Sequence, residues 1–434
     1  MRLLFVTYEF PPKGGPGVQR PLKLVKYLPQ SGWESTVLTV LDPPTALVDA
    51  TLEAELPAST RVVRAWSLEP TRVIQFLRRL RGGSGAAADA APSGAVGFSG
   101  APSWTVGAVQ GLFVPDEKRF WRPWAVRAGT AATAADDCIV VVSSGPPHTA
   151  HVVAGAIARR LSLPHVADLR DPWVGAYHRR YATPLHRAAD ARLERRVLSA
   201  ASTIVTVTEQ MAEMYRERYP GVRVLVIPNG YDPADLPAAP SGTHEGLVLA
   251  YTGTFGGARQ PESFLAGVAL AEARQPELAQ DLRIVAAGPG QEFVAAARRA
   301  GVRSTVEALG YVSHERSLQV LAASDVALLV LSAGEESRVS LSGKVFEYLG
   351  MRKPILAVVG EGPAAELVES VTGGRVASFD DPASVAVALE ELYAVWRSGS
   401  LMGPTEAEAA RFSRVEQAQA YAALLEEVAD ARRA

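Results

Sequence analysis

The chain has 434 residues, of which 48% are hydrophobic and 21% charged, a composition typical of a globular protein with about two or three domains. Its 44 basic and 46 acidic side chains leave a net charge of −2, which argues against a nucleic-acid-binding protein, because such proteins carry a basic surface. The single cysteine, Cys138, excludes an intramolecular disulfide, and no apolar run approaches the roughly 18 residues that span a bilayer. The apolar start, Met1–Thr7, meets Glu9 too early for a signal peptide, so we expect a soluble, cytoplasmic protein.

Short apolar runs alternate with amphipathic stretches along most of the chain, a pattern that predicts βαβ units and parallel sheets. In the first half, this pattern predicts buried strands at Leu3–Tyr8, Ser35–Leu41, Cys138–Ser143, Thr203–Val207 and Arg223–Ile227. In the second half, it predicts strands at Leu247–Tyr251, Leu282–Ala286, Val326–Leu331, Ile355–Val359 and Gly374–Ser378. Helical periodicity predicts helices at Arg20–Ser31, Thr149–Leu161 and Gly343–Gly350.

A change of composition divides the chain near residue 235, where residues 235–243 have the proline, alanine and serine content of a linker. Because strands and helices recur on both sides, we predict an α/β protein of two doubly wound, Rossmann-like domains, residues 1–235 and 246–400. The last segment, Glu406–Arg433, is predicted as one helix, and we expect residues 405–434 to pack back across both domains. Its apolar stripe consists of Phe412, Val415, Tyr421, Leu424, Leu425 and Val428.

Two neighbouring segments of the first half have unusual compositions. Residues 82–102 are mostly glycine, alanine, serine and proline, which predicts a flexible surface loop, with a functional lid as the alternative. The preceding segment, Thr71–Arg81, alternates apolar side chains with arginines. We interpret it as an ordinary surface helix, with peripheral contact on the inner face of a membrane as the alternative.

Glycines follow the first predicted strand, in the segment Lys13–Gly17. Glycine at this place lets the backbone approach a phosphate or a sugar, and a glycine turn without a ligand is the alternative. When Gly15 and Gly17 are aligned with the G-x-G-x-x-G dinucleotide fingerprint, its third glycine falls on Arg20. Because arginine is too bulky for close packing of helix and strand, a nicotinamide cofactor is disfavoured.

A second candidate site lies between two predicted strands of the second half, in the segment Ser340–Gly350. Ser342 is predicted as the N-cap of a helix, and Gly343 leaves backbone N–H groups open. Lys344 falls in the first turn, where a cation is disfavoured unless an anion is nearby. Together with Glu347 it suits a nucleoside diphosphate, with the lysine at the phosphates and the glutamate at the ribose. A solvated Lys–Glu helix face is the alternative.

Other motifs narrow the chemistry further. The glycine-rich loop Tyr251–Gln260 holds Arg259, whose planar fork is suited to a diphosphate. The sequence contains neither D-x-D nor H-E-x-x-H, so we expect no metal site. His148 and His151 form an H-x-x-H pair without an evident third ligand, which we interpret as an ordinary helix start.

These motifs, in this order, resemble those of family-four glycosyltransferases with the GT-B fold (glycosyl transferases group 1), over nearly the whole chain. The matching pieces are Phe10–Pro12 with Gly14–Gly17, Asp168–Trp173, Ile227–Asp232, Ala287–Gly290 and Lys344–Tyr348. The resemblance implies two Rossmann-like domains separated by a cleft, with the acceptor on the first domain and the nucleotide sugar on the second.

The resemblance also implies roles for particular residues. Arg259 and Lys344 correspond to the basic residues at the diphosphate, and Glu347 to the second glutamate of the family's E-x7-E motif, which holds the ribose. Asp171 falls near the place of a catalytic-cleft histidine in many relatives. We therefore predict Arg259, Lys344 and Asp171 as catalytic residues. The predicted donor-binding residues are Gly15, Gly17, Gly288, Val312, Ser342, Gly343 and Glu347.

The chain departs from the family pattern at two positions. Val339 stands where the first glutamate of E-x7-E is expected, and the usual Gly-Arg after the first strand of the second domain is Gly253-Thr254. The predicted function is a retaining glycosyltransferase, of the hexosyltransferase class, that uses a nucleoside-diphosphate sugar and an unknown hydroxyl acceptor without a metal or other cofactor. The alternatives are an epimerase or coupling enzyme of the same fold, or a nucleotide-sugar-binding protein without catalysis.

Overall fold

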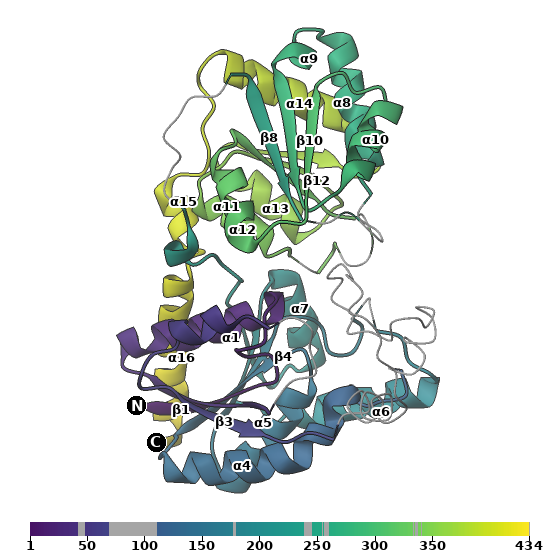
Figure 1. The fold of residues 1–434 in the computed structure, drawn as a ribbon. Coiled ribbons are helices and arrows are strands. Elements are labelled where there is room, and N and C mark those ends of the chain that lie inside the picture. Colours follow the sequence, from purple (N-terminus) through teal and green to yellow (C-terminus); the bar gives the residue numbers. More distant parts are fainter. Residues whose placement is uncertain are drawn as a thin grey trace, which may run out of the picture. The chain divides into compact units, whose positions relative to one another are not determined.

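The computed structural model describes residues 1–41, 48–68, 111–176, 179–237, 245–253, 255, 260–332, 334, 337–339 and 341–433. It divides into two compact units (Figure 1). The first contains Met1–Ile227 together with Ala418–Ala434, and the second contains Pro228–Gln417. The segments 71–81 and 82–102 lie outside the described residues, as does Arg259. Within the described ranges, no helix is both long enough and apolar enough to cross a bilayer.

The described part of the first unit holds a seven-stranded sheet, in the order β3-β2-β1-β4-β5-β6-β7, with parallel pairing throughout. Its strands are β1 (Arg2–Thr7), β2 (Glu34–Val40), β3 (Arg61–Ala65), β4 (Val140–Gly145), β5 (His165–Leu169), β6 (Thr203–Thr206) and β7 (Arg223–Val226). Its helices are α1 (Pro16–Tyr27), α4 (Arg122–Ala135), α5 (Thr149–Leu161), α6 (Pro184–Leu198) and α7 (Glu209–Arg218). The sequence did not predict β3 or β5.

The second unit holds a six-stranded parallel sheet in its described part, in the order β10-β9-β8-β11-β12-β13. Its strands are β8 (Leu247–Thr252), β9 (Leu282–Ala287), β10 (Thr305–Gly310), β11 (Val326–Val330), β12 (Ile355–Val359) and β13 (Gly374–Ser378). Its helices are α8 (Glu262–Arg274), α9 (Leu278–Asp281), α10 (Gln291–Arg299), α11 (His314–Ala322), α12 (Lys344–Gly350), α13 (Pro363–Glu369), α14 (Pro382–Arg397) and α15 (Glu406–Ala410). Of these strands, only β10 was not predicted.

Helices cover both faces of the second sheet (Figure 1), because successive strand residues alternate between two apolar cores. Leu249 and Tyr251 of β8 pack with α8, α10 and α14, whereas Ala250 packs with α11, α12 and α13. Strands that are buried on both faces explain the nearly continuous apolar runs of the sequence. The second sheet is therefore doubly wound. The first sheet is likewise parallel with helices between its strands, and the predicted fold class is confirmed.

The predicted single helix Glu406–Arg433 is wrong, because α15 ends at Ala410 and α16 (Arg414–Arg433) begins four residues later. In the gap, the Tyr231 N–H donates to the Phe412 carbonyl and the Arg414 N–H donates to the Tyr231 carbonyl, at 3.1 and 2.8 Å. This β-bridge uses backbone groups that a continuous helix would keep for itself. A Cβ atom at Gly230 would lie 2.0 Å from the Phe412 oxygen, so glycine permits the close approach of the two segments.

Candidate active site

Glycines end three neighbouring strands at the carboxyl edge of the second sheet, the edge at which open α/β sheets bind ligands. Gly253 follows β8, Gly288 follows β9 and Gly310 ends β10, with φ values of +130°, +124° and +68°. The Gly253 N–H donates to Ala287 and the Gly288 N–H donates to Gly310, both at 2.7 Å. A Cβ atom at Gly288 would lie 2.0 Å from the Gly253 oxygen, so only glycine fits this backbone crossing.

The Lys344 side chain reaches from the first residue of α12 to this glycine edge. A Cβ atom at Gly253 would lie only 1.6 Å from Lys344 Nζ. The ammonium group therefore occupies space that any other residue at position 253 would fill with its side chain. The same Nζ lies 5.4 Å from the centroid of the Tyr251 ring, within the range of a cation–π contact. The structure thus joins two predicted motifs, the loop after β8 and the start of α12.

Glu347 lies one turn further along α12, and 30% of its side chain is exposed. Its Oε1 is 3.9 Å from Nε2 of His314, the first residue of α11. Burial raises the pKa of Glu347, while His314 and Lys344 act in the opposite direction. The sequence analysis predicted a role for Glu347 but not for His314. The histidine lies on a different helix, and no motif around it indicates a binding site.

Tyr348 attaches α12 to the sheet. Its hydroxyl donates to the Leu328 carbonyl at 3.1 Å and lies 3.2 Å from Thr252 Oγ1. The predicted N-cap, Ser342, is wrong, because Gly343 caps the helix without any side-chain bond.

The remaining predicted donor residues of the second unit lie at or near the same edge. Gly288 belongs to the backbone crossing described above, and Val312 follows β10 by two residues and packs partly buried on one of the two cores. Ser342 is half-buried and Gly343 is exposed. Val345 N and Phe346 N donate to the carbonyls of these two residues, at 3.3 and 3.2 Å.

The first unit places its predicted residues at the carboxyl edge of its own sheet. Gly15, with φ +102°, precedes α1 and follows β1, while half-buried Asp171 follows β5. Arg170 connects the segments: its guanidinium donates to the carbonyls of Gly17, Gly145 and Pro146, the last two at 3.2 and 2.6 Å. This fork holds the glycine loop and the Asp171 segment together.

The buried ion pair of Arg20 and Asp168 was not predicted. Arg20 Nη2 lies 2.8 Å and Nε 3.0 Å from the two Asp168 oxygens, and both side chains are almost fully buried. The Tyr421 hydroxyl from α16 and the Ser144 hydroxyl also donate to Asp168, at 2.5 and 2.7 Å. Burial opposes the charge of the carboxylate, but Arg20 and these hydroxyls hold the pKa of Asp168 below its usual value.

The H-x-x-H pair starts a helix, as predicted, because His148 is the N-cap of α5 and His151 lies in its first turns. Both rings are buried and contact Trp173, and the His148 ring stacks on the indole with centroids 5.2 Å apart. His151 Nδ1 lies 2.8 Å from Ser143 Oγ. Burial lowers the pKa of His151 to about 3, so this ring is neutral at physiological pH.

Comparison with protein-family models assigns both halves of the chain. Residues 90–235 match the model Glycosyltransferase Family 4, and residues 246–394 match the model Glycosyl transferases group 1. The chain belongs to these GT-B glycosyltransferases. The family resemblance seen in the sequence motifs is thereby confirmed, and the protein is an enzyme of this class. A search of curated proteins gave no match.

Solved structures share the fold of this glycosyltransferase at low sequence identity. Sucrose-phosphate synthase from Thermosynechococcus elongatus has a TM-score of 0.60 at 14% identity, with 99% of each chain covered. HepE from Anabaena, in complex with UDP-glucose, has a TM-score of 0.58 at 16% identity, covering 98% of this chain and 100% of its own. α,α-Trehalose-phosphate synthase (UDP-forming) from Burkholderia vietnamiensis has a TM-score of 0.57 at 14% identity, with 99% of each chain covered.

Proposed function

We propose that this glycosyltransferase moves a sugar from a nucleoside-diphosphate sugar to a hydroxyl acceptor, with retention of the anomeric configuration. The observation that carries the proposal is the pair of Lys344 and Glu347 on one short helix beside the glycine edge of the second sheet. An ammonium group at this edge neutralises phosphate, and a carboxylate one turn away accepts hydrogen bonds from ribose hydroxyls. The structural neighbour HepE, solved with UDP-glucose, supports a nucleotide-sugar donor.

The proposed reaction breaks the bond between the anomeric carbon and the phosphate oxygen and forms a bond from that carbon to the acceptor oxygen. Negative charge develops on the departing diphosphate, where Lys344 stabilises it. The acceptor proton passes to a phosphate oxygen of the leaving group, so no pair of carboxylates of the glycosidase type is needed. Because cationic side chains can neutralise the diphosphate, we propose a metal-independent reaction.

On the acceptor side, we propose that the Gly15–Gly17 loop and Asp171 serve the hydroxyl substrate and the donor phosphates. Arg170, next to Asp171, joins these two segments through the Gly17 carbonyl, and it also donates to the Gly145 and Pro146 carbonyls at the end of β4. The acceptor class that we propose is a cell-surface glycan, a lipid or a small natural product. A cytoplasmic location, with peripheral contact on the inner face of the membrane, belongs to the same proposal.

The test is incubation of the whole chain with a panel of nucleotide sugars, starting with UDP-glucose, and acceptor mixtures, followed by mass spectrometry. We expect release of the nucleoside diphosphate and a product that is one sugar heavier than the acceptor. Excess chelator should leave the rate unchanged. An epimerised sugar, or donor binding without turnover, would contradict glycosyl transfer. Loss of turnover in chelator that manganese or magnesium restores would contradict only the metal-independent mechanism.

Glu347→Ala should mainly raise the donor KM, because the carboxylate holds the ribose in both the ground state and the transition state. Loss of a hydrogen bond to a charged group predicts an increase of roughly 10-fold or more. Since burial raises the pKa of Glu347, the wild-type KM should rise on acidification at a higher pH than an exposed glutamate would give. Donor-saturation kinetics measures both effects.

The matched control for this experiment is Glu315→Ala, which removes an exposed glutamate near the start of α11. It should leave the donor KM and its pH profile unchanged. An unchanged donor KM in Glu347→Ala would show that the glutamate does not contact the ribose.

A further inference from the structure

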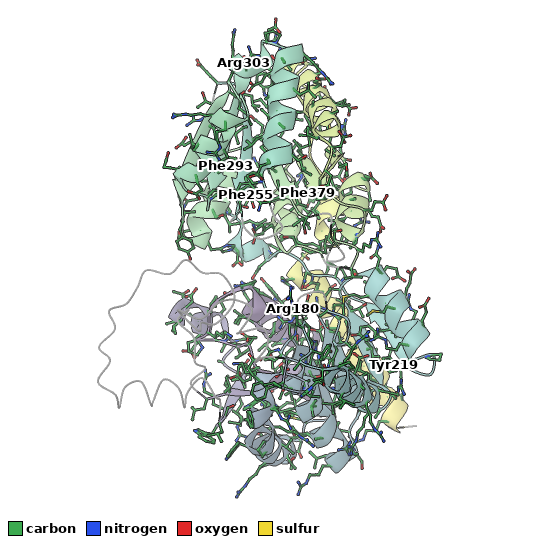
Figure 2. All side chains as sticks on the ribbon, turned by 90° about the vertical axis from the view of Figure 1, so that its right-hand side faces the viewer. Arg180, Tyr219, Phe255, Phe293, Arg303 and Phe379 are labelled. Atoms are coloured by element: carbon green, nitrogen blue, oxygen red, sulfur yellow. The ribbon has the colours of Figure 1, made fainter. Side chains whose placement is uncertain are left out.

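Two aromatic rings on either side of Gly253 in the sequence stack on each other. The Phe255 ring lies parallel to the Tyr251 ring, with centroids 4.2 Å apart and an angle of 4° between the planes. The Phe255 ring also stacks with the ring of Phe293 in α10, with centroids 5.1 Å apart and an angle of 19° between the planes. Tyr251 and Phe293 are each only 2% exposed, so the Phe255 ring packs against the buried core of the second unit. Phe255 and Phe293 are both labelled in Figure 2.

The Lys344 ammonium group lies against two residues beside this stack, Tyr251 and Gly253. Gly253 lies midway between the two stacked rings in the sequence, and its α-carbon faces Lys344 Nζ. The Tyr251 ring contacts Phe255 through its stack and Lys344 through the cation–π contact at 5.4 Å. On its other side, the Gly253 backbone is held by the 2.7 Å hydrogen bond to Ala287. A shift of Phe255 would therefore move the surface beneath the ammonium.

We propose that Phe255 is a positioning residue for glycosyl transfer, acting through Gly253 and Tyr251 on Lys344. This inference rests on the proposed function, because it assigns Lys344 to the donor diphosphate. Two flat rings in parallel contact fix both the position and the direction of each other, which a flexible aliphatic side chain cannot do. The requirement is thus for an aromatic ring at residue 255, and not only for apolar volume.

The first test compares Phe255→Leu with Phe255→Tyr and with Phe379→Leu as a matched control. Phe379 is a half-buried phenylalanine that packs on the same core after β13 (Figure 2). Displacement of a group that acts in the transition state predicts a decrease of kcat by roughly 10-fold to 100-fold in Phe255→Leu, with little change in donor KM. Phe255→Tyr keeps the ring and should retain the wild-type kcat, and so should Phe379→Leu.

A double-mutant cycle with Lys344→Ala decides whether Phe255 acts through the lysine. If it does, Phe255→Leu should change kcat by less than about 2-fold when Lys344 is already alanine. Multiplicative losses in the double variant would overturn the proposal, and so would a normal kcat in Phe255→Leu. Thermal melting checks the fold, and Phe255→Met supplies a second variant of similar volume if leucine impairs folding.

Failure of the proposed function gives a different result from failure of this inference. If Lys344→Ala turns over normally, the assignment of the lysine to the diphosphate is wrong, whatever Phe255→Leu does. If Lys344→Ala is impaired while Phe255→Leu is normal, only the positioning role of Phe255 is wrong.

Discussion

Lys344→Ala is expected to lower kcat roughly 10²–10³-fold with a smaller change in donor KM, by analogy with the loss of one preorganised oxyanion donor. The reason is that negative charge on the diphosphate grows as the glycosidic bond breaks, so the ammonium group contributes most in the transition state. The measurement is donor-saturation kinetics on variants whose folding is checked by thermal melting. Arg316→Ala on α11 is the matched control, because its side chain is exposed and contacts Gln319.

Gly253→Ala tests the same contact between Gly253 and the Lys344 ammonium group, by changing the glycine instead of the lysine. A methyl group at residue 253 would occupy the position of Nζ, so the ammonium group must move even though Lys344 itself is unchanged. We expect a kcat close to that of Lys344→Ala, together with a loss of stability, because a φ of +130° is unfavourable for alanine. Normal turnover in both variants would exclude Lys344 from the chemistry.

Arg20→Ala should reduce the free energy of unfolding by about 3–5 kcal/mol, because it leaves the buried carboxylate of Asp168 without its counterion. The double variant Arg20→Met with Asp168→Asn removes both charges and should recover much of this loss. The matched control is Arg223→Ala, which breaks an exposed ion pair with Glu427 of α16 and should cost no more than about 1 kcal/mol. Urea and thermal unfolding measure all of these differences.

The pH dependence of unfolding gives a second readout of the buried pair. The pKa of Asp168 in the folded state lies below that of an unfolded aspartate. The pair therefore stabilises fully above the unfolded pKa, and this stabilisation is lost as the pH falls through the folded pKa. The double variant, which has no carboxylate at residue 168, should lack this part of the acid dependence. Equal stability of Arg20→Ala and Arg223→Ala would show that the buried pair does not stabilise the first unit.

The sequence by itself determined most of the secondary structure, because strands buried on both faces must be apolar along their length. The strands that it missed show the limit of this signal. β5 carries His165 and Asp168 inside a buried sheet, and these polar residues interrupt the apolar run by which a buried strand is predicted. They are tolerated because His165 Nε2 lies 2.7 Å from Ser143 Oγ and Asp168 is paired with Arg20. Neither partner can be identified from the strand itself.

The sequence also placed Lys344 and Glu347 on one helix, because three residues along an α-helix return to nearly the same face. Only the tertiary structure decided what stands beside them. Gly253 reaches α12 from the end of β8, and His314 from the first turn of α11. Their contacts depend on the order of the strands in the sheet, which periodicity does not encode.

The same reason explains the break between α15 and α16 and the burial of Arg20. Local propensity favours one continuous helix through Phe412, but backbone pairing with Tyr231, distant in sequence, takes its hydrogen bonds. Arg20 meets Asp168 and Tyr421 across separations of 148 and 401 residues. Local pattern determines which residues can be buried, whereas the partner of a buried charge is decided by packing between elements that are far apart in the chain.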